Sequence, residues 1–360
     1  MNDTILDVRN LSRFFASPKP LFGTQTIVRA VDNVSFSVRR GETLAIVGES
    51  GCGKSTLARL IVRLIEPDAG TVHFNGKDIS RARGAEMRSL RRDMQIVFQV
   101  PVSSLNPRMS VGEIITEALW LKGGLTKAQR RARAAELLET VGLRAAHAGR
   151  YPHEFSGGQR QRIGIARAIA GGPKLLVGDE PVSALDVSIQ AQIINLLEDL
   201  KERLALTLIV IAHDLAVIRH MSDRVMVMYL GEIVESAPVE ALFASPRHPY
   251  TRALLAAIPA PVPGAGKARV LLSGDVPNPA NPPPGCRFHT RCPHAQAICS
   301  ETAPELIDTG GQRHVSCHFW SDLPDEPGLG ARAGEDSAAK RRRLELYTEM
   351  QKARAPAATA

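Results

Sequence analysis

The segment "TLAIVGESGCGKSTLARLIVRLI", which begins at Thr43, constrains the fold of this chain more than any other. Its first five residues form a short apolar run typical of a buried strand, and the residues after the glycines have helical spacing. Between them lies a match to the pattern G-x-x-x-x-G-K-[ST], formed by Gly48, Gly53, Lys54 and Ser55. A strand, a glycine loop and a helix in this order are typical of a loop that binds the phosphates of a nucleotide.

Each residue type of this phosphate loop has a physical role. Glycines let the backbone wind closely around phosphates, its N–H groups point inward, and the following helix N-terminus attracts anions. We expect Lys54 to reach the β- and γ-phosphates and Ser55 to bind Mg²⁺. A glycine-rich turn with an incidental lysine is the alternative. The predicted binding residues are Gly48, Glu49, Ser50, Gly51, Cys52, Gly53, Lys54, Ser55 and Thr56, with the Cys52 thiol expected to fill space.

Two acidic residues, Asp179 and Glu180, close the apolar run of "KLLVGDEP". Residues 175–178 are expected to form a buried parallel strand, which places both carboxylates at its carboxyl end. Asp179 is placed to hold Mg²⁺, mostly through water, and Glu180 to polarise an attacking water molecule. Acids that end an apolar strand downstream of a phosphate loop indicate nucleotide hydrolysis.

A second anion-binding helix start is predicted in "EFSGGQRQRIGIARAIA", which opens with Ser156, Gly157, Gly158 and Gln159. A hydroxyl, a flexible glycine backbone and the helix dipole together favour an anion, and ordinary N-capping is the alternative. One phosphate loop needs no second phosphate site for its own nucleotide. We therefore expect this helix start to serve the nucleotide of another chain.

The chain resembles the ATP-binding subunit of ABC transporters. The stretches "GESGCGKST", "FSGGQ", "LLVGDEP", "SALD" and "IAHD" match Walker A, signature, Walker B, D-loop and H-loop of that family, over about residues 5–260. The resemblance implies an α/β fold, the P-loop NTPase ABC cassette, with a RecA-like parallel sheet, an antiparallel β layer and a helical subdomain. It also implies an ATPase that uses Mg²⁺ and dimerises head-to-tail, with ATP between the Walker A loop of one chain and the signature of the other.

The resemblance assigns further site residues by position. Gln99, in "IVFQ", is expected to sense Mg²⁺ and to contact a membrane partner. His213 would contact the γ-phosphate, and Asp186 would bridge the two halves of the dimer. Phe15 is the candidate to stack on adenine, with Phe14 or a hydrophobic-core role as alternatives. The expected catalytic residues are Glu180, His213 and Gln99, and the expected Mg²⁺ ligands are Ser55, Gln99 and Asp179.

Two positions depart from the family pattern. Val100 follows the glutamine where Asp or Asn is usual, and Gly178 stands in Walker B where alanine is common. The catalytic acids, the histidine and the lysine are all present, so we predict an active ATPase.

The motifs and the resemblance predict how the chain is divided into domains. The cassette is expected over residues 1–260, with a helical subdomain at about 100–165, a C-terminal extension over 261–322 and a polar, basic tail over 323–360. Residues 1–80 should form the antiparallel layer and the first parallel strand, and 81–170 should include the mostly helical insertion that ends at the signature. Further strands are predicted at 207–212, 225–229 and 232–235, the last two forming a hairpin that turns at Leu230 and Gly231.

The C-terminal extension resembles that of peptide- and nickel-importer ATPases over about residues 245–320, on the phrases "HPYT" and "GCRFHTRCP". Four cysteines there, spaced C-x5-C-x6-C-x17-C, are expected to form one site: Cys286, Cys292, Cys299 and Cys317. The spacing lacks the C-x2-C pairs of common zinc sites, and four thiolates on an irregular loop can hold an iron–sulfur cluster. The resemblance adds that some importer ATPases carry a [4Fe–4S] centre here. Zn²⁺, with His289, His294 or His318 as substitute ligands, and simple buried thiols are the alternatives.

Composition narrows the possible locations and partners. No apolar run approaches the 18 residues of a membrane span, and the N-terminal residues have no secretory character, so we expect a peripheral protein on the cytoplasmic face of the inner membrane. Thiols in a reducing cytosol favour metal ligation over disulfides. The net charge of +8 permits nucleic-acid contact, but aromatic residues make up only 4% of the chain, which argues against base stacking.

The predicted function is energy coupling in a di- or oligopeptide importer. Expected partners are a second, non-identical ATPase subunit, two integral membrane permeases and, indirectly, a solute-binding protein. The segment "KPLFGTQTIVRAVDNVSF" indicates the second, F-like type of the two ATPases. Import of nickel, glutathione or another small solute is an alternative, as is a soluble ABC ATPase acting on ribosomes or nucleic acid. The latter usually carries two cassettes or a long insertion, so no nucleic-acid partner is expected.

Overall fold

The computed structural model describes residues 3–17, 25–99, 104–183, 185–213, 215–258 and 274–323. Val100 and residues 324–360 of the basic tail lie outside the described residues, so the predictions made for them are not taken further.

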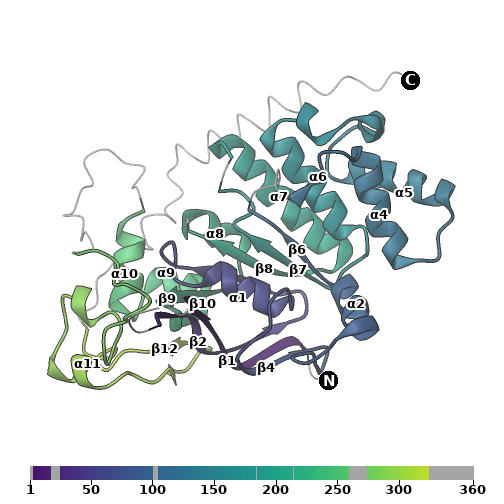
Figure 1. Ribbon diagram of the computed structural model, residues 1–360. Helices are drawn as coiled ribbons and strands as arrows, with labels where there is room; N and C mark the ends of the chain where they lie inside the picture. The colour runs from purple at the N-terminus through teal and green to yellow at the C-terminus, as the bar shows by residue number, and fades with distance from the viewer. Residues whose placement is uncertain are drawn as a thin grey trace, which may run out of the picture.

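A mixed sheet with the strand order β11-β12-β10-β9-β3-β8-β7-β6 runs through the centre of the molecule (Figure 1). Its parallel strands are β6 (Met94–Val97), β7 (Leu175–Asp179), β8 (Thr207–Ala212), β3 (Thr43–Val47) and β9 (Arg224–Tyr229). Strands β3, β7 and β8 are buried along their whole length, which explains their continuous apolar sequences. The strands predicted from these runs are confirmed.

The predicted hairpin is also confirmed. β9 and β10 (Glu232–Pro238) pair in antiparallel fashion. The two residues between them, Leu230 and Gly231, have φ angles of 43° and 87°. Positive φ at both positions is the backbone of a tight hairpin turn, which glycine adopts without strain and leucine does not.

A separate antiparallel sheet, order β2-β1-β4-β5, covers one side of the mixed sheet. Its strands are β1 (Thr4–Ala16), β2 (Ile27–Arg39), β4 (Ala69–Phe74) and β5 (Lys77–Asp78). The helix α1 (Lys54–Ile61) lies in one hydrophobic core with both sheets, through buried residues such as Leu57 and Leu60. This packing fixes the N-terminus of α1 directly beyond the end of β3.

Other helices pack on both sides of the mixed sheet, and most of them join the core on the side away from the antiparallel sheet. These are α2 (Gly84–Asp93), α4 (Val111–Lys122), α5 (Lys127–Thr140), α6 (Gly157–Ile169), α7 (Val187–Leu204), α8 (Leu215–Met221) and α9 (Val239–Ala244), with short 3₁₀ turns at Ala145–Gly149 and Pro152–Glu154. Capping boxes start α4, α5 and α6 at Ser110, Thr126 and Ser156. Figure 1 shows α4 and α5 at the end of the molecule away from the C-terminal extension.

The C-terminal extension packs beside β9, β10 and α10 (Pro249–Ala256), as Figure 1 shows in green and yellow. It contains a 3₁₀ turn at His289–Arg291, α11 (Ala297–Glu301), β11 (Ile307–Asp308) and β12 (His314–Val315). β12 pairs with β10 through Glu235 and Val315, so the extension adds two strands to the central sheet.

Candidate functional site

The phosphate loop (residues 48–53) connects β3 to α1, where the strand–loop–helix order was predicted. Gly48 and Gly53 have φ angles of 152° and 106°, and neither position has room for a side chain. A Cβ at Gly48 would lie 2.2 Å from the backbone oxygen of Met228, and a Cβ at Gly53 would lie 2.0 Å from that of Ala30. The two glycines of the motif are therefore required by close contact with β9 and β2.

Lys54 and Ser55 follow the loop at the first turn of α1. The Lys54 side chain is buried, and its Nζ donates hydrogen bonds to the backbone oxygens of Gly48 at 2.8 Å and Glu49 at 2.9 Å. Ser55 Oγ donates to Asp179 Oδ1 at 2.7 Å. The structure thus brings together two of the predicted Mg²⁺ ligands from α1 and the end of β7. Burial raises the pKa of the Asp179 carboxyl, so a bound cation would stabilise its charged form.

The second acid, Glu180, lies at the convergence of three segments. Its Oε2 accepts a hydrogen bond from Gln99 Nε2 at 2.8 Å and lies 3.5 Å from His213 Nδ1. Its backbone N–H donates to the Ile211 oxygen of β8, and its φ is 48°, which is strained for a residue with a side chain. The three residues predicted to be catalytic are therefore neighbours.

The signature residues form the N-terminus of α6. Ser156 is exposed, its Oγ accepts from Gln159 N, and the Gln159 side chain accepts from Ser156 N. Gly157 is exposed as well, whereas Gly158 packs against Ile189, whose Cγ2 would lie 2.5 Å from an added Cβ. Asp186 begins α7 beside this helix start and is also exposed. Among the described residues, no hydrogen bond or ion pair joins the signature to the phosphate loop.

Phe15, predicted to stack on adenine, is 42% exposed on β1. The Arg13 guanidinium lies 5.0 Å from the centre of its ring. The alternative of a hydrophobic-core role is therefore wrong for Phe15.

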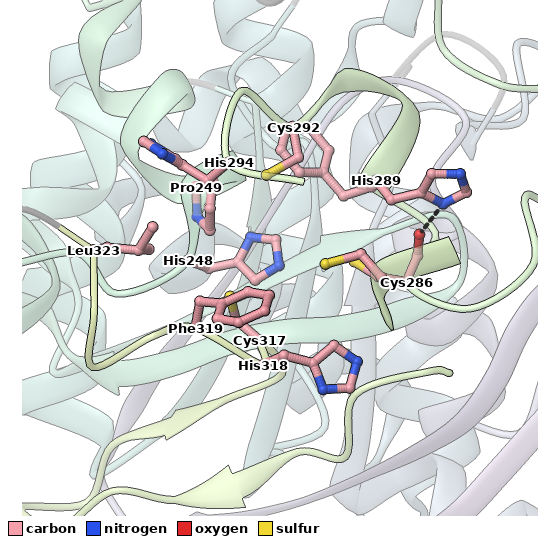
Figure 2. Close-up of a pocket in the computed structure, with 12 residues that line it drawn as sticks. His248, Pro249, Cys286, His289, Cys292, His294, Cys317, His318, Phe319 and Leu323 are labelled. Atoms are coloured by element: carbon pink, nitrogen blue, oxygen red, sulfur yellow. Dashed lines mark hydrogen bonds between the residues drawn. The ribbon is translucent and has the colours of Figure 1, made fainter. Parts of the chain in front are cut away.

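The four C-terminal cysteines line one cavity, shown in Figure 2. Cys286, Cys292 and Cys317 come from different parts of the extension and surround His248 (Figure 2). All five cysteines are free thiols, and the fifth, Cys52, is buried in the phosphate loop. Burial, together with the neighbouring thiols, raises the pKa of Cys286 to about 12 and of Cys317 to about 11. These two thiols are protonated at neutral pH unless a cation binds them.

The structure does not itself display a metal site at these cysteines. Within the described parts of the chain, no group of three or more His, Cys, Asp or Glu side chains is arranged to hold a metal ion. The predicted zinc and iron–sulfur sites therefore rest on the chemistry and convergence of the four thiols alone.

Two residues that contact the phosphate loop were missed by the sequence analysis. Tyr250 accepts a hydrogen bond from Glu49 N, and Arg291 forms an ion pair with the Glu49 carboxylate. Both lie in the phrases "HPYT" and "GCRFHTRCP", which served only to mark a family resemblance. The two phrases carry no periodic or spacing signal that links them to the phosphate loop, so this contact appears only in the structure.

Comparison with known families gives two matches. A family described as "ABC transporter" matches residues 31–183, and one described as "Oligopeptide/dipeptide transporter, C-terminal region" matches residues 234–299.

No helix within the described ranges is long and apolar enough to cross a membrane.

Curated relatives extend over nearly the whole cassette and extension. The chain is 50% identical over 323 residues to the oligopeptide transport ATP-binding protein AppF of Bacillus subtilis. The matched region covers 89% of this chain and 98% of that protein. It is 48% identical over 318 residues to the di/tripeptide transport ATP-binding protein DppF of Pseudomonas aeruginosa, covering 88% and 98%.

A solved structure supports the fold assignment. The dimeric, post-hydrolysis structure of the ATP-binding cassette MJ0796 bound to ADP and Pi is 30% identical, with a TM-score of 0.58. The match covers 65% of this chain and 99% of that one. From the site geometry and these relatives together, we conclude that the chain is an ABC transporter ATPase and belongs to the ATP-binding proteins of the oligopeptide/dipeptide transporter family.

Proposed function

We propose that this chain powers the import of di- or oligopeptides from the cytoplasmic face of the inner membrane. It would pair head-to-tail with a second, non-identical ATPase subunit beneath two integral membrane permeases, which receive cargo from a solute-binding protein. The names of the relatives support peptides as cargo, and the dimeric state of the matched cassette supports the pairing.

One observation carries this proposal. The phosphate loop and the acids at the end of β7 form one half of an ATP site, while Ser156 and Gly157 present a second, exposed anion-binding helix start. The dipole and free N–H groups of such a helix start stabilise a phosphate. The dimeric state of the matched cassette supports a second chain as the source of the helix start that completes each ATP site.

Within the half-site, each predicted residue has a role that its geometry supports. Lys54 and the loop N–H groups would neutralise the β- and γ-phosphates, and Ser55, Asp179 and Gln99 would hold Mg²⁺. Glu180 would polarise the attacking water, with His213 next to the γ-phosphate. Phe15, with its exposed ring, would stack on adenine. Catalysis of phosphoryl transfer by positioning and charge needs no covalent intermediate.

We propose a [4Fe–4S] cluster at the four cysteines that line the cavity, with Zn²⁺ as the alternative. His289, His294 and His318 also line this cavity, so they are the further candidate ligands if the occupant is Zn²⁺. Four cysteine thiolates are the usual ligand set of an iron–sulfur cluster, and four cysteines line this cavity. When bound, the cluster would supply a structural clip for a segment with few regular elements, held by Cys286, Cys292, Cys299 and Cys317.

Metal analysis tests the cluster directly. Protein purified without oxygen should contain iron and acid-labile sulfide, and Cys286→Ser or Cys299→Ser should remove both. Cys52→Ser is the matched control, because this buried thiol lies in the phosphate loop, and it should leave the iron content unchanged. Equimolar zinc without iron would contradict the proposal.

An uptake assay tests the cargo. Cells that lack this subunit should lose growth on a panel of di- and oligopeptides as sole amino-acid source, and the parent chain should restore it. Loss of nickel or glutathione uptake with normal peptide growth would contradict peptide as cargo, without affecting the ATPase assignment.

A further inference from the structure

We infer that Arg291 and Tyr250 position the phosphate loop for ATP, so that the C-terminal extension contributes to nucleotide affinity through Arg291. Neither residue belongs to the loop, and both act through one loop residue, Glu49. The inference rests on the ATPase function alone and is independent of the cargo.

Arg291 holds the Glu49 side chain at both carboxylate oxygens. Its Nη1 lies 2.7 Å from Oε2 and its Nη2 lies 3.0 Å from Oε1. The Arg291 side chain is 5% exposed and that of Glu49 is 24% exposed, so the pair is largely shielded from water. A two-point contact between guanidinium and carboxylate fixes orientation as well as distance.

Tyr250 holds the backbone of the same residue. Its buried hydroxyl accepts a hydrogen bond from Glu49 N at 2.8 Å, and it lies on α10, next to His248 and Pro249. Glu49 is thus fixed by its main chain and by its side chain, from two segments that are about 40 residues apart in the sequence.

The backbone oxygen of Glu49 is a hydrogen-bond partner of Lys54, so the position of Glu49 determines where that partner lies. Lys54 Nζ donates to Glu49 O at 2.9 Å, and Cys52 N donates to the same oxygen at 3.3 Å. A rotation of Glu49 would therefore displace the partner of Lys54 and the turn that shapes the loop. This makes Arg291 and Tyr250 positioning residues and not catalytic ones.

Arg291 and Tyr250 are connected to the cysteine cavity by packed aromatic rings. The rings of Tyr229, Tyr250 and Phe288 pack with centroids 4.7 to 5.4 Å apart, and Phe288 lines the cavity. Arg291 lies 5.9 Å from the centre of the Tyr229 ring and is followed directly by Cys292. The folding state of the cysteine segment is thereby coupled to the loop that binds ATP.

The competing explanation is that Arg291 only anchors the extension to the cassette. Arg287 provides a control that distinguishes anchoring from positioning of the phosphate loop. Arg287 is also buried and ties the extension to the cassette, through Asp32, Glu232 and the backbone oxygen of Leu230. It forms no hydrogen bond or ion pair with residues 48–53 itself, and its nearest link to them is the bond from Gly231 N to the Cys52 oxygen. If Arg291 only anchored the extension, weakening either arginine would have the same effect on ATP binding.

The test compares Arg291→Lys, Tyr250→Phe and the control Arg287→Lys in the full chain with its ATPase partner. Tyr250→Phe removes one hydrogen-bond acceptor, so KM for ATP should rise about fivefold, or ~1 kcal/mol at 1.4 kcal/mol per tenfold. Arg291→Lys should raise KM as well, because one point charge replaces a two-point contact. The control should leave KM unchanged, and kcat should stay within twofold in all three, because Glu180, Gln99 and His213 are untouched.

Two results would overturn the inference. One is an equal rise in KM for Arg287→Lys and Arg291→Lys, which would indicate anchoring alone. The other is unchanged KM for Tyr250→Phe and for Glu49→Gln, variants that keep the shape of their residues and decide the question even if Arg291→Lys fails to fold. In a double-mutant cycle, Glu49→Gln and Arg291→Lys should be non-additive in KM.

Discussion

Gln99 and Glu180, 81 positions apart in the sequence, share a hydrogen bond of 2.8 Å between an amide nitrogen and a carboxylate oxygen. The bond joins the segment after β6 to the end of β7, two strands that are neighbours in the central sheet. It fixes the orientation of the carboxylate expected to polarise water, and His213 approaches the same oxygen from the segment after β8. A small movement of either segment would therefore alter the geometry of hydrolysis.

Glu180→Gln should retain ATP binding and lose hydrolysis. The amide keeps the shape and can still accept from Gln99, but it cannot polarise water as a carboxylate does. General-base catalysis typically contributes 10² to 10⁴ in rate, so turnover should fall at least a hundredfold. Single-turnover ATPase assays and binding of a fluorescent ATP analogue measure the two effects separately. Glu202→Gln, an exposed change on α7, serves as the control, and parental turnover by Glu180→Gln would show that another residue acts on the water.

Backbone strain at Glu180 predicts that glycine at this position gives a more stable protein than alanine does. At a φ of 48°, the backbone conformation costs alanine about 1 kcal/mol more than it costs glycine. Glu180→Gly should therefore have a free energy of unfolding about 1 kcal/mol above that of Glu180→Ala, although both lose the same side-chain contacts. Urea unfolding of the two nucleotide-free variants measures the difference, and equal stabilities would mean that the backbone is unstrained in solution.

Buried His248 predicts acid sensitivity. Burial lowers its pKa from the ordinary value of 6.5 to about 3. Above pH 6.5 the folded and unfolded chains both carry neutral His248, so its contribution to stability is complete. As the pH falls from 6.5 toward 3, the unfolded chain gains a proton that the folded chain does not bind, and stability falls by up to about 1.4 kcal/mol per pH unit.

A matched pair of variants isolates this effect. His248→Asn keeps a side-chain acceptor for Tyr250 N, the bond that His248 Nδ1 makes at 3.0 Å. Its free energy of unfolding should depend less on pH between 6.5 and 4 than that of the parent chain. His153→Asn, at an exposed position, should not change the slope. Identical slopes for the parent and His248→Asn would mean that this histidine is protonated in the folded protein.

Much of the half-site could be predicted from the sequence, because its residues sit next to local patterns. Walker A lies between an apolar strand and a helix, and both acids follow a buried strand, so order along the chain determines which edge of the sheet they share. The hairpin turn was placed correctly even though Leu230, with positive φ, is an unusual turn residue.

Contacts between distant segments could not be predicted in this way. β6 is only four residues long, and no strand was predicted there, just before the helical subdomain expected at about 100–165. The pairing of β12 with β10 and the ion pair of Arg291 with Glu49, 242 positions apart, depend on tertiary packing that leaves no periodic signal. The sequence could not predict which metal or cluster the cysteine cavity holds either, because four thiols suit several metals.

The composite ATP site is tested most directly at Gly157. The position is exposed, its φ is not left-handed, and an added Cβ would meet only Leu185, at an ordinary 3.4 Å. Gly157→Asp should therefore fold, and an acid in the first turn of α6 should leave its stability equal or higher. The same charge would repel the phosphates of ATP held by the partner's loop.

The decisive measurement is the ATPase rate of the reconstituted pair with Gly157→Asp in this chain, alongside ATP binding by the variant chain alone. We predict that the variant binds ATP as the parent does, while the rate at the site completed by its α6 falls at least a hundredfold. An unchanged rate in the pair would contradict the claim that two chains build each site.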